Sequence, residues 1–146
     1  MPYSPMLVQP MRQELTAAGV EELLTAADVD RWMNEKQGTA LLVVNSVCGC
    51  AAGAARPAIR LALASGVRPD RVASVFAGQD VEATAKARSY FADIPPSSPA
   101  MALYKDGELV YFVPRHRIEG RSAQQLADDL QQAFERHAAA AGAERG

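Results

Sequence analysis

The amino-acid sequence predicts an α/β protein in which a central mixed sheet of about four strands is flanked by helices. Two apolar runs, residues 39–45 and 71–76, have the length and the branched side chains of buried strands. A helical segment lies between them, and a strand–helix–strand unit forms a right-handed parallel crossover. Asp106-Gly107 separates two further apolar runs, which is a strong signal of an antiparallel hairpin.

Composition favours one folded domain over residues 1–146. The chain has 146 residues and is 49% hydrophobic, which is enough to build a core without disulfides. Its formal net charge is −2, which argues against a nucleic-acid partner, because such partners select a basic face. No apolar run reaches the ~20 residues that span a bilayer, and the first residues lack the pattern of a signal peptide. We therefore expect a cytoplasmic protein with no membrane partner.

The first third of the chain is predicted to supply helices. Residues 1–10 contain three prolines and no regular period, so we expect an irregular lead-in. Residues 11–18 form a short helix that Gly19 closes. Thr25 and Asp28 have the spacing of a capping box. Three apolar side chains then recur on one helix face and are expected in the core: Val29, Trp32 and Met33.

Three further helices are predicted after the first strand. Residues 51–65 are alanine-rich, and Pro57 among them either kinks the helix or marks a late start in its first turn. The helix over residues 79–91 is expected to turn three side chains inward: Val81, Ala85 and Tyr90. Ser122 opens a capping box for the last helix, whose apolar face is Leu126, Leu130, Ala133 and Phe134. Residues 138–146 are expected to fray.

The order of these elements brings four segments to one edge of the sheet. Parallel strands end at the same edge, so Cys48 and the turn at residues 78–80 should lie together. If the first hairpin strand runs antiparallel to them, Ser98 and Pro99 precede it at that edge. The second hairpin strand returns there and delivers the loop at residues 114–120. Ligands of open α/β sheets bind at such an edge.

The only two cysteines of the chain, Cys48 and Cys50, flank Gly49 between the first strand and the following helix. Backbone N–H groups and the positive end of the helix dipole gather there, which favours a thiolate. We expect Gly49 to permit a turn that a side chain would crowd. Because structural disulfides are rare in the cytoplasm, the pair indicates redox chemistry, with metal binding and inert packing as the alternatives.

A metal or iron–sulfur carrier is the non-catalytic interpretation of the same two thiols. Two cysteines supply at most half of a tetrahedral site, and His116 is the candidate for a third protein ligand. A cluster with four sulfur ligands would need a second copy of the chain. Coloured or metal-bearing purified protein would favour this class.

Four segments, in this order, resemble the bacilliredoxin family of small thioredoxin-like bacterial proteins. They are Val44-Asn45-Ser46-Val47-Cys48-Gly49-Cys50-Ala51, Phe76-Ala77-Gly78-Gln79-Asp80, Pro95-Pro96-Ser97-Ser98-Pro99 and Arg115-His116-Arg117-Ile118-Glu119-Gly120. The resemblance covers nearly the whole chain and implies a thioredoxin-like three-layer sandwich. It also implies removal of bacillithiol from protein mixed disulfides, with Cys48 attacking, Cys50 resolving, and a cis bond before Pro99.

The resemblance and the convergence of loops together predict a substrate site around the cysteines. Its expected residues are Gly49, Ser98, Pro99, Arg115, His116 and Arg117. Arginine matches carboxylates with a planar, always-charged fork, and bacillithiol carries carboxylates; a solvated loop is the alternative. Asp80 is expected to cap a helix rather than to act as a base.

The resemblance also implies three kinds of partner. They are bacillithiolated client proteins, the low-molecular-weight thiol as a substrate, and a reductase that regenerates the thiols. No tightly bound cofactor is expected. A general disulfide reductase or isomerase is the nearest alternative activity.

Overall fold

The computed structural model of the protein describes residues 2–64 and 66–145, with the side chains of the last helix up to residue 138. Within these residues five strands form one mixed sheet: β1 (Glu21–Glu22), β2 (Thr39–Asn45), β3 (Arg71–Phe76), β4 (Ala100–Lys105) and β5 (Glu108–Val113). Their order across the sheet is β1-β3-β2-β4-β5. β3 runs parallel to β1 and β2, whereas the β2–β4 and β4–β5 pairs are antiparallel.

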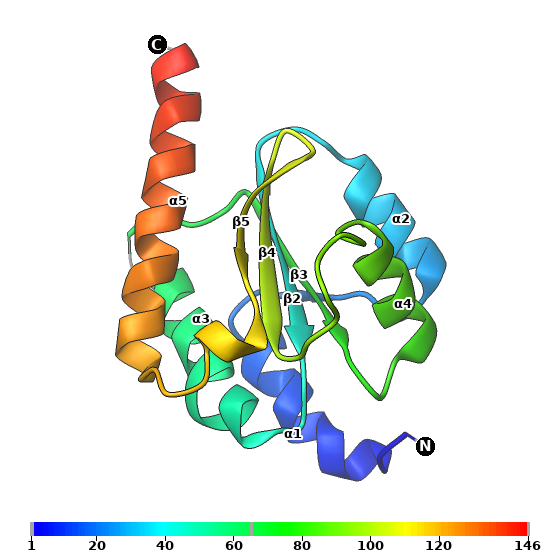
Figure 1. The fold of residues 1–146 in the computed structure, drawn as a ribbon. Coiled ribbons are helices and arrows are strands. Elements are labelled where there is room, and N and C mark those ends of the chain that lie inside the picture. Colours follow the sequence, from blue (N-terminus) through cyan, green and yellow to red (C-terminus); the bar gives the residue numbers. More distant parts are fainter. Residues whose placement is uncertain (1, 65, 146) are drawn as a thin grey trace.

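Helices cover both faces of this sheet and give three layers (Figure 1). α3 (Arg56–Ala64) and α5 (Ala123–Arg145) pack on one face, and α2 (Ala26–Asn34) and α4 (Val81–Ser89) on the other. α1 (Pro5–Thr16) lies at the end of the sheet where β2 and β3 finish. Two short helices lie at that end as well, the π-helix η1 (Ala51–Ala55) and the 3-10 helix η2 (Arg115–Arg117).

The predicted α/β sandwich is confirmed, and the sheet has one strand more than the expected four. The added strand is β1, a two-residue edge strand that pairs with β3 through Glu21 and Glu22. Two consecutive glutamates carry no apolar alternation, so the sequence gives no strand signal at this position.

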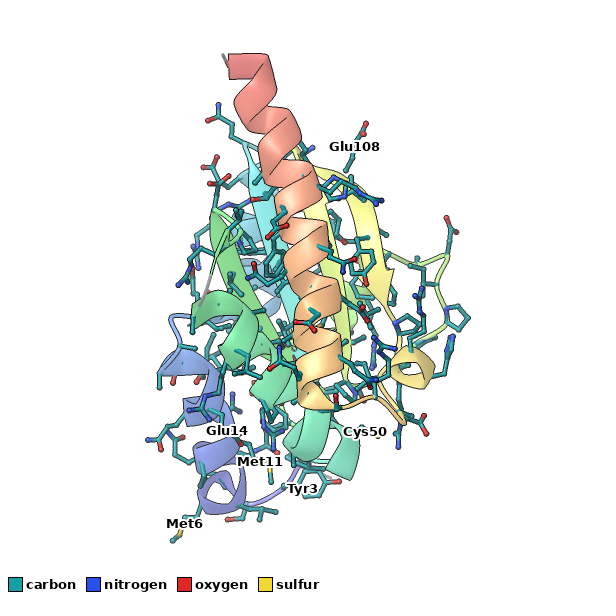
Figure 2. The ribbon with its side chains drawn as sticks, turned by 90° about the vertical axis from the view of Figure 1, so that its left-hand side faces the viewer. Tyr3, Met6, Met11, Glu14, Cys50 and Glu108 are labelled. Atoms are coloured by element: carbon teal, nitrogen blue, oxygen red, sulfur yellow. The ribbon has the colours of Figure 1, made fainter. Side chains whose placement is uncertain are left out.

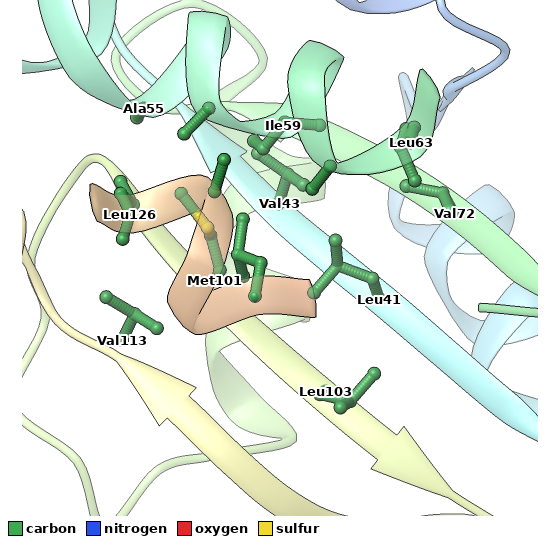
Figure 3. Close-up of a cluster of buried hydrophobic side chains, with 14 of the residues drawn as sticks. Leu41, Val43, Ala55, Ile59, Leu63, Val72, Met101, Leu103, Val113 and Leu126 are labelled. Atoms are coloured by element: carbon green, nitrogen blue, oxygen red, sulfur yellow. The ribbon is translucent and has the colours of Figure 1, made fainter. Parts of the chain in front are cut away.

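β2 is the central strand, and all seven of its residues are buried. Leu41 and Val43 join the apolar cluster beneath α3 and α5, together with Ile59 (Figure 3). Leu42 and Val44 join the cluster on the opposite face. A strand covered on both faces needs this unbroken apolar run. It also fixes the register, because a slip by one residue would exchange the two sets.

The N-terminal segment is helical, so the predicted irregular lead-in over residues 1–10 is wrong from Pro5 onward. Ser4 caps α1, and its hydroxyl accepts a backbone N–H from the first turn at 3.3 Å. Pro5 lies in that first turn, where a missing N–H costs no helical hydrogen bond. Pro10 interrupts only one bond of the ladder, and the burial of Leu15 anchors the helix to the core.

The helix after the cysteines starts in π-helical form as η1 and continues as α3. Pro57 is the second residue of α3. The two alternatives for this proline were a kink in the helix and a late helix start. The structure instead shows a change from π-helix to α-helix just before it. Proline has no N–H with which to continue the regular ladder across this point. Single π-helical turns of this kind are frequent at functional sites.

Both predicted capping boxes are present. Thr25 and Asp28 bond each other's backbone at the start of α2, and Ser122 and Gln125 do so at the start of α5. The apolar faces predicted for these two helices are buried as expected: Val29, Trp32, Met33, Leu126, Leu130, Ala133 and Phe134. These local signals therefore fix where the helices begin and which face they bury.

The inward face predicted for the helix over residues 79–91 is wrong. Val81, Ala85 and Tyr90 are all exposed, and the side chains that α4 buries are Ala83, Thr84 and Ala87. α5 is helical through Arg145, and the expected fraying of residues 138–146 stays a prediction; the last of these residues lies outside the described part. Among the described helices, none is long and apolar enough to cross a membrane.

Candidate active site

Four segments meet at the edge of the sheet where β2 and β3 end, as the order of elements predicts. Asn45 at the end of β2 is level with Phe76 at the end of β3. The peptide bond before Pro99 is cis, as the resemblance implied. Val113 of β5 pairs with Met101 of β4, so η2 begins at the same edge.

The Cys-Gly-Cys segment forms the first turn of the helix after β2. The Cys48 carbonyl accepts the N–H groups of Ala51 at 3.1 Å and Ala52 at 3.2 Å. Cys48 and Cys50 are half-buried free thiols, and Cys50 packs against the core (Figure 2). Gly49 is exposed, its φ lies outside the left-handed region, and a Cβ there would meet nothing within 4 Å. The expected crowding at Gly49 is therefore wrong, since neither conformation nor space requires glycine.

Ser46 connects the end of β2 to the thiol of Cys48. The Cys48 N–H donates to the Ser46 hydroxyl at 3.2 Å. Burial is the largest single influence on Cys48 and opposes its ionisation, but hydrogen bonds from Ser46 and nearby backbone N–H groups and the charge of Arg115 outweigh it. The pKa of Cys48 is therefore lowered from its ordinary value, which raises the fraction of reactive thiolate.

A buried arginine holds the Ser46 segment in place. Arg56 is only 2% exposed. Its Nη1 donates to the Ser46 carbonyl at 2.6 Å and to Asn45 Oδ1 at 3.1 Å, and its Nε donates to Glu14 at 2.9 Å. The same Asn45 Oδ1 accepts the Ser46 N–H at 2.8 Å. A buried charge is tolerated only with such partners, so Arg56 fixes the residues that in turn bond Cys48.

Arg115 is the member of the predicted Arg-His-Arg loop that interacts with the cysteines. The negative charges of ionised Cys48 and Cys50 raise its pKa. Its backbone N–H donates to the Ser97 hydroxyl at 3.1 Å, and its Nη1 donates to the Ser98 carbonyl at 3.5 Å. These bonds tie η2 to the segment before the cis-proline, so the cysteines, the cis bond and one arginine form a single site.

His116 and Arg117 line a different feature, a groove between β5 and α5. The structure thus divides the predicted loop, because Arg115 interacts with the cysteines whereas His116 and Arg117 line the groove. No three His, Cys, Asp or Glu side chains of the described residues gather closely enough to hold a metal ion.

Polar pairs fasten α1 to the same edge of the sheet. The Arg12 guanidinium donates to both carboxylate oxygens of Asp80, at 2.8 and 3.0 Å. Asp80 occupies the predicted N-cap position of α4, but its side chain makes no capping hydrogen bond. Tyr3 and Gln79 exchange two further hydrogen bonds, at 2.7 and 2.9 Å. The turn after β3 is thereby held by the N-terminal helix.

Two residues that support the candidate nucleophile escaped prediction. Arg56 stands in an alanine-rich helix, where the surrounding sequence does not indicate that an arginine is buried. Ser97 lies in the proline-rich segment, and its bond to Arg115 depends on how two loops meet. The one available signal was that Ser46 precedes the first cysteine by two residues, the spacing at which a serine hydroxyl bonds the backbone ahead of it.

Solved thioredoxin structures share the fold of this chain. Fasciola hepatica thioredoxin superposes with a TM-score of 0.54 over 81% of this chain and 99% of that one, at 19% identity. The thioredoxin pre-protein of Schistosoma mansoni gives a TM-score of 0.53 over 79% of this chain and 97% of that one, at 18% identity. At such identities these comparisons establish the thioredoxin fold alone.

Comparison with proteins of similar sequence identifies the family of this chain. The family described as Disulphide isomerase matches residues 3–138. A bacilliredoxin from Halalkalibacterium halodurans is 53% identical over 135 residues, which cover 92% of this chain and 94% of the relative. A bacilliredoxin from Salinibacter ruber is 56% identical over 137 residues, which cover 92% and 81%. With more than half of the aligned residues identical over nearly its whole length, the chain belongs to the bacilliredoxin family and is a thiol–disulfide oxidoreductase.

Proposed function

We propose that this oxidoreductase removes bacillithiol from protein mixed disulfides through Cys48 and Cys50. The observation that carries the proposal is the Cys48 thiol, which is half-buried at the end of the central strand and has a lowered pKa. The name of its relatives supports bacillithiol as the small thiol. Cytoplasmic location is part of the proposal, because free cysteine pairs persist in a reducing compartment.

In the first proposed step the Cys48 thiolate attacks the bacillithiol sulfur of a mixed disulfide. A bond forms between these two sulfurs, the original disulfide breaks, and the client cysteine leaves as a thiolate. The Cys50 thiolate then attacks the Cys48 sulfur, which forms the Cys48–Cys50 disulfide and releases bacillithiol. Two electrons from a partner reductase return the pair to free thiols.

Recognition of the substrate is assigned to the residues around the thiols. Arg115 sets an always-charged guanidinium close to both cysteines, which suits the carboxylates of the adduct. The open space at Gly49 leaves room for the client beside Cys48. The full set of proposed contacts is Gly49, Ser98, Pro99, Arg115, His116 and Arg117.

The experiment that tests this assignment follows the thiol adduct by mass spectrometry. Cys50→Ala should strip bacillithiol from a client protein and stall with bacillithiol attached to Cys48, whereas Cys48→Ala should be inactive. The same client carrying mercaptoethanol serves as the matched substrate control. Equal activity of the two variants, or an adduct on Cys50 in the wild-type protein, would contradict the assignment.

General disulfide reduction or isomerisation is the second candidate function. It is favoured by the matching family, whose description is Disulphide isomerase. A refolding assay on scrambled, disulfide-bonded ribonuclease separates the two functions. Rapid reactivation of the ribonuclease together with slow removal of bacillithiol would select the isomerase.

A further inference from the structure

The groove between β5 and α5 gathers both histidines of the chain and three of its arginines. Its volume is about 450 Å³, a size typical of small-molecule sites. His116, Arg117 and Arg121 come from the segment after β5, and Arg136 and His137 come from α5. The two elements lie side by side in Figure 2, with α5 nearest the viewer.

Carboxylates neutralise only part of the positive charge in this groove. Arg121 pairs with Asp129 at 2.5 Å, and Glu119 pairs with Arg115 at 3.3 Å. Arg117 and Arg136 form no ion pair within the part of the chain that the structure describes. The Nε of Arg121 is buried and has no hydrogen-bond partner there either. The guanidinium groups of Arg117 and Arg136 are therefore available to bind a negatively charged ligand.

The charged side chains of the groove shift the pKa values of His137 and Tyr111. Burial, Arg136 and Lys105 together lower the pKa of His137. Burial and Asp129 raise the pKa of Tyr111, while Arg117 and Arg121 act in the opposite direction. Tyr111, Arg117 and Arg121 line the same groove, so one ligand there can contact all three.

We propose that this groove binds a small molecule that carries two or more negative charges, such as a dicarboxylate or a phosphate ester. Guanidinium groups bind both kinds of anion through paired hydrogen bonds. Tyr111 and Ala133, which also line the groove, provide an apolar wall for a short carbon skeleton. The anion has two sources, a free metabolite or the acidic end of the thiol adduct.

The groove and the cysteines meet at η2. Arg115 interacts with Cys48 and Cys50, whereas Arg117, two residues later in the same short helix, lines the groove. An anion bound to Arg117 would therefore lie close to Arg115, the arginine that interacts with the thiols. This proximity is why the acidic end of an adduct is one of the two candidate sources.

The test uses the two histidines as probes, because the chain has no others and both line the groove. Titration of the reduced full-length protein with succinate should shift both imidazole signals in NMR spectra and reach saturation. Arg117→Gln combined with Arg136→Gln should weaken binding by about tenfold per arginine, the lower end for a hydrogen bond to a charged group. The matched control is Arg60→Gln on α3, which is exposed, lies outside the groove and should bind succinate like the wild type.

The result that would overturn the proposal is a shift that does not saturate, or one that Arg60→Gln weakens as much as the double variant does. Either outcome would mean that the signals report ionic strength alone. A circular-dichroism spectrum and a Tm like those of the wild type show that the double variant is folded. An Arg117→Lys, Arg136→Lys variant, which keeps the charge but loses the forked geometry, should bind with intermediate affinity.

A kinetic comparison identifies the source of the anion, and this comparison alone rests on the proposed function. If the groove holds the acidic end of the adduct, Arg136→Gln should raise KM several-fold for bacillithiolated client and leave KM unchanged for client carrying mercaptoethanol. If the groove holds a free anion, both KM values should stay unchanged while succinate binding is still weakened. Absence of bacillithiol removal by the wild type, with succinate binding intact, would contradict only the proposed function.

Discussion

Replacing Arg56 by methionine should destabilise the protein strongly, because methionine keeps an apolar stem and loses the whole guanidinium. The change strands one buried acceptor, the Ser46 carbonyl, and removes the charged hydrogen bonds to Asn45 Oδ1 and Glu14, although Asn45 Oδ1 keeps its bond from the Ser46 N–H. The stranded carbonyl costs about 1–3 kcal/mol, each lost charged hydrogen bond adds about 1.5 kcal/mol, and relief of the buried charge offsets part of the sum. We therefore expect the free energy of unfolding to fall by about 3 kcal/mol.

Urea denaturation measures this loss, and thermal denaturation should show Tm lower by about 10 °C for a domain of this size. The matched control is Arg60→Met, which removes an exposed arginine four residues further along the same helix and should cost less than about 0.5 kcal/mol. Arg56→Lys should restore part of the stability, because an ammonium can still donate to the Ser46 carbonyl. A loss of less than about 1 kcal/mol for Arg56→Met, below the cost of one stranded acceptor, would refute the reasoning.

Ser46→Ala removes a hydrogen bond that lowers the pKa of Cys48, so that pKa should rise. Because only the thiolate reacts, the pH at half-maximal rate of the first step should move upward, and an unchanged pH profile would show that the serine acts only on the backbone. Arg115→Gln should slow the removal of an acidic thiol adduct more than the removal of a neutral one. The difference between the two rates should shrink at 1 M salt, where the screening length is about 3 Å. Equal slowing of both reactions would mean that Arg115 acts on the thiolate alone. Leu42→Ala empties a fully buried position in β2 and should cost about 2–5 kcal/mol in urea denaturation, so a smaller loss would mean that the core closes around the gap.

Most of the fold could be predicted because its central elements have strong local signals. β2 and β3 begin and end at the predicted residues, since their branched apolar runs stop at polar neighbours. The start of α1, residues 5–10, was missed because its prolines break the helical pattern, whereas the rest of that helix was predicted. β1 was missed because two glutamates carry no strand signal. The buried face of α4 was wrong because small residues, Ala83 and Ala87, carry its packing and larger ones face solvent.

The site was predictable where topology alone brings residues together. Strand order places Cys48, Pro99 and Arg115 at one edge without any knowledge of side-chain directions. Arg56 was not predictable, because its partner Glu14 lies 42 residues away and the bond depends on how α1 and α3 pack. The separation of Arg115 from Arg117 likewise depends on the short turn of η2, whose direction the sequence Arg115-His116-Arg117 does not reveal.

The fastening of α1 to the cysteine end of the sheet matters to anyone who would build a redox sensor from this protein. Arg12 and Glu14 connect that helix to Asp80 and Arg56, and Arg56 in turn bonds Ser46, so we expect a change at the start of the chain to affect Cys48. The far end of α5 projects from the opposite end of the molecule, well away from η1 and η2 (Figure 1). A fluorescent reporter joined behind α5 should leave the reactive thiol undisturbed, whereas one joined ahead of α1 should alter its reactivity.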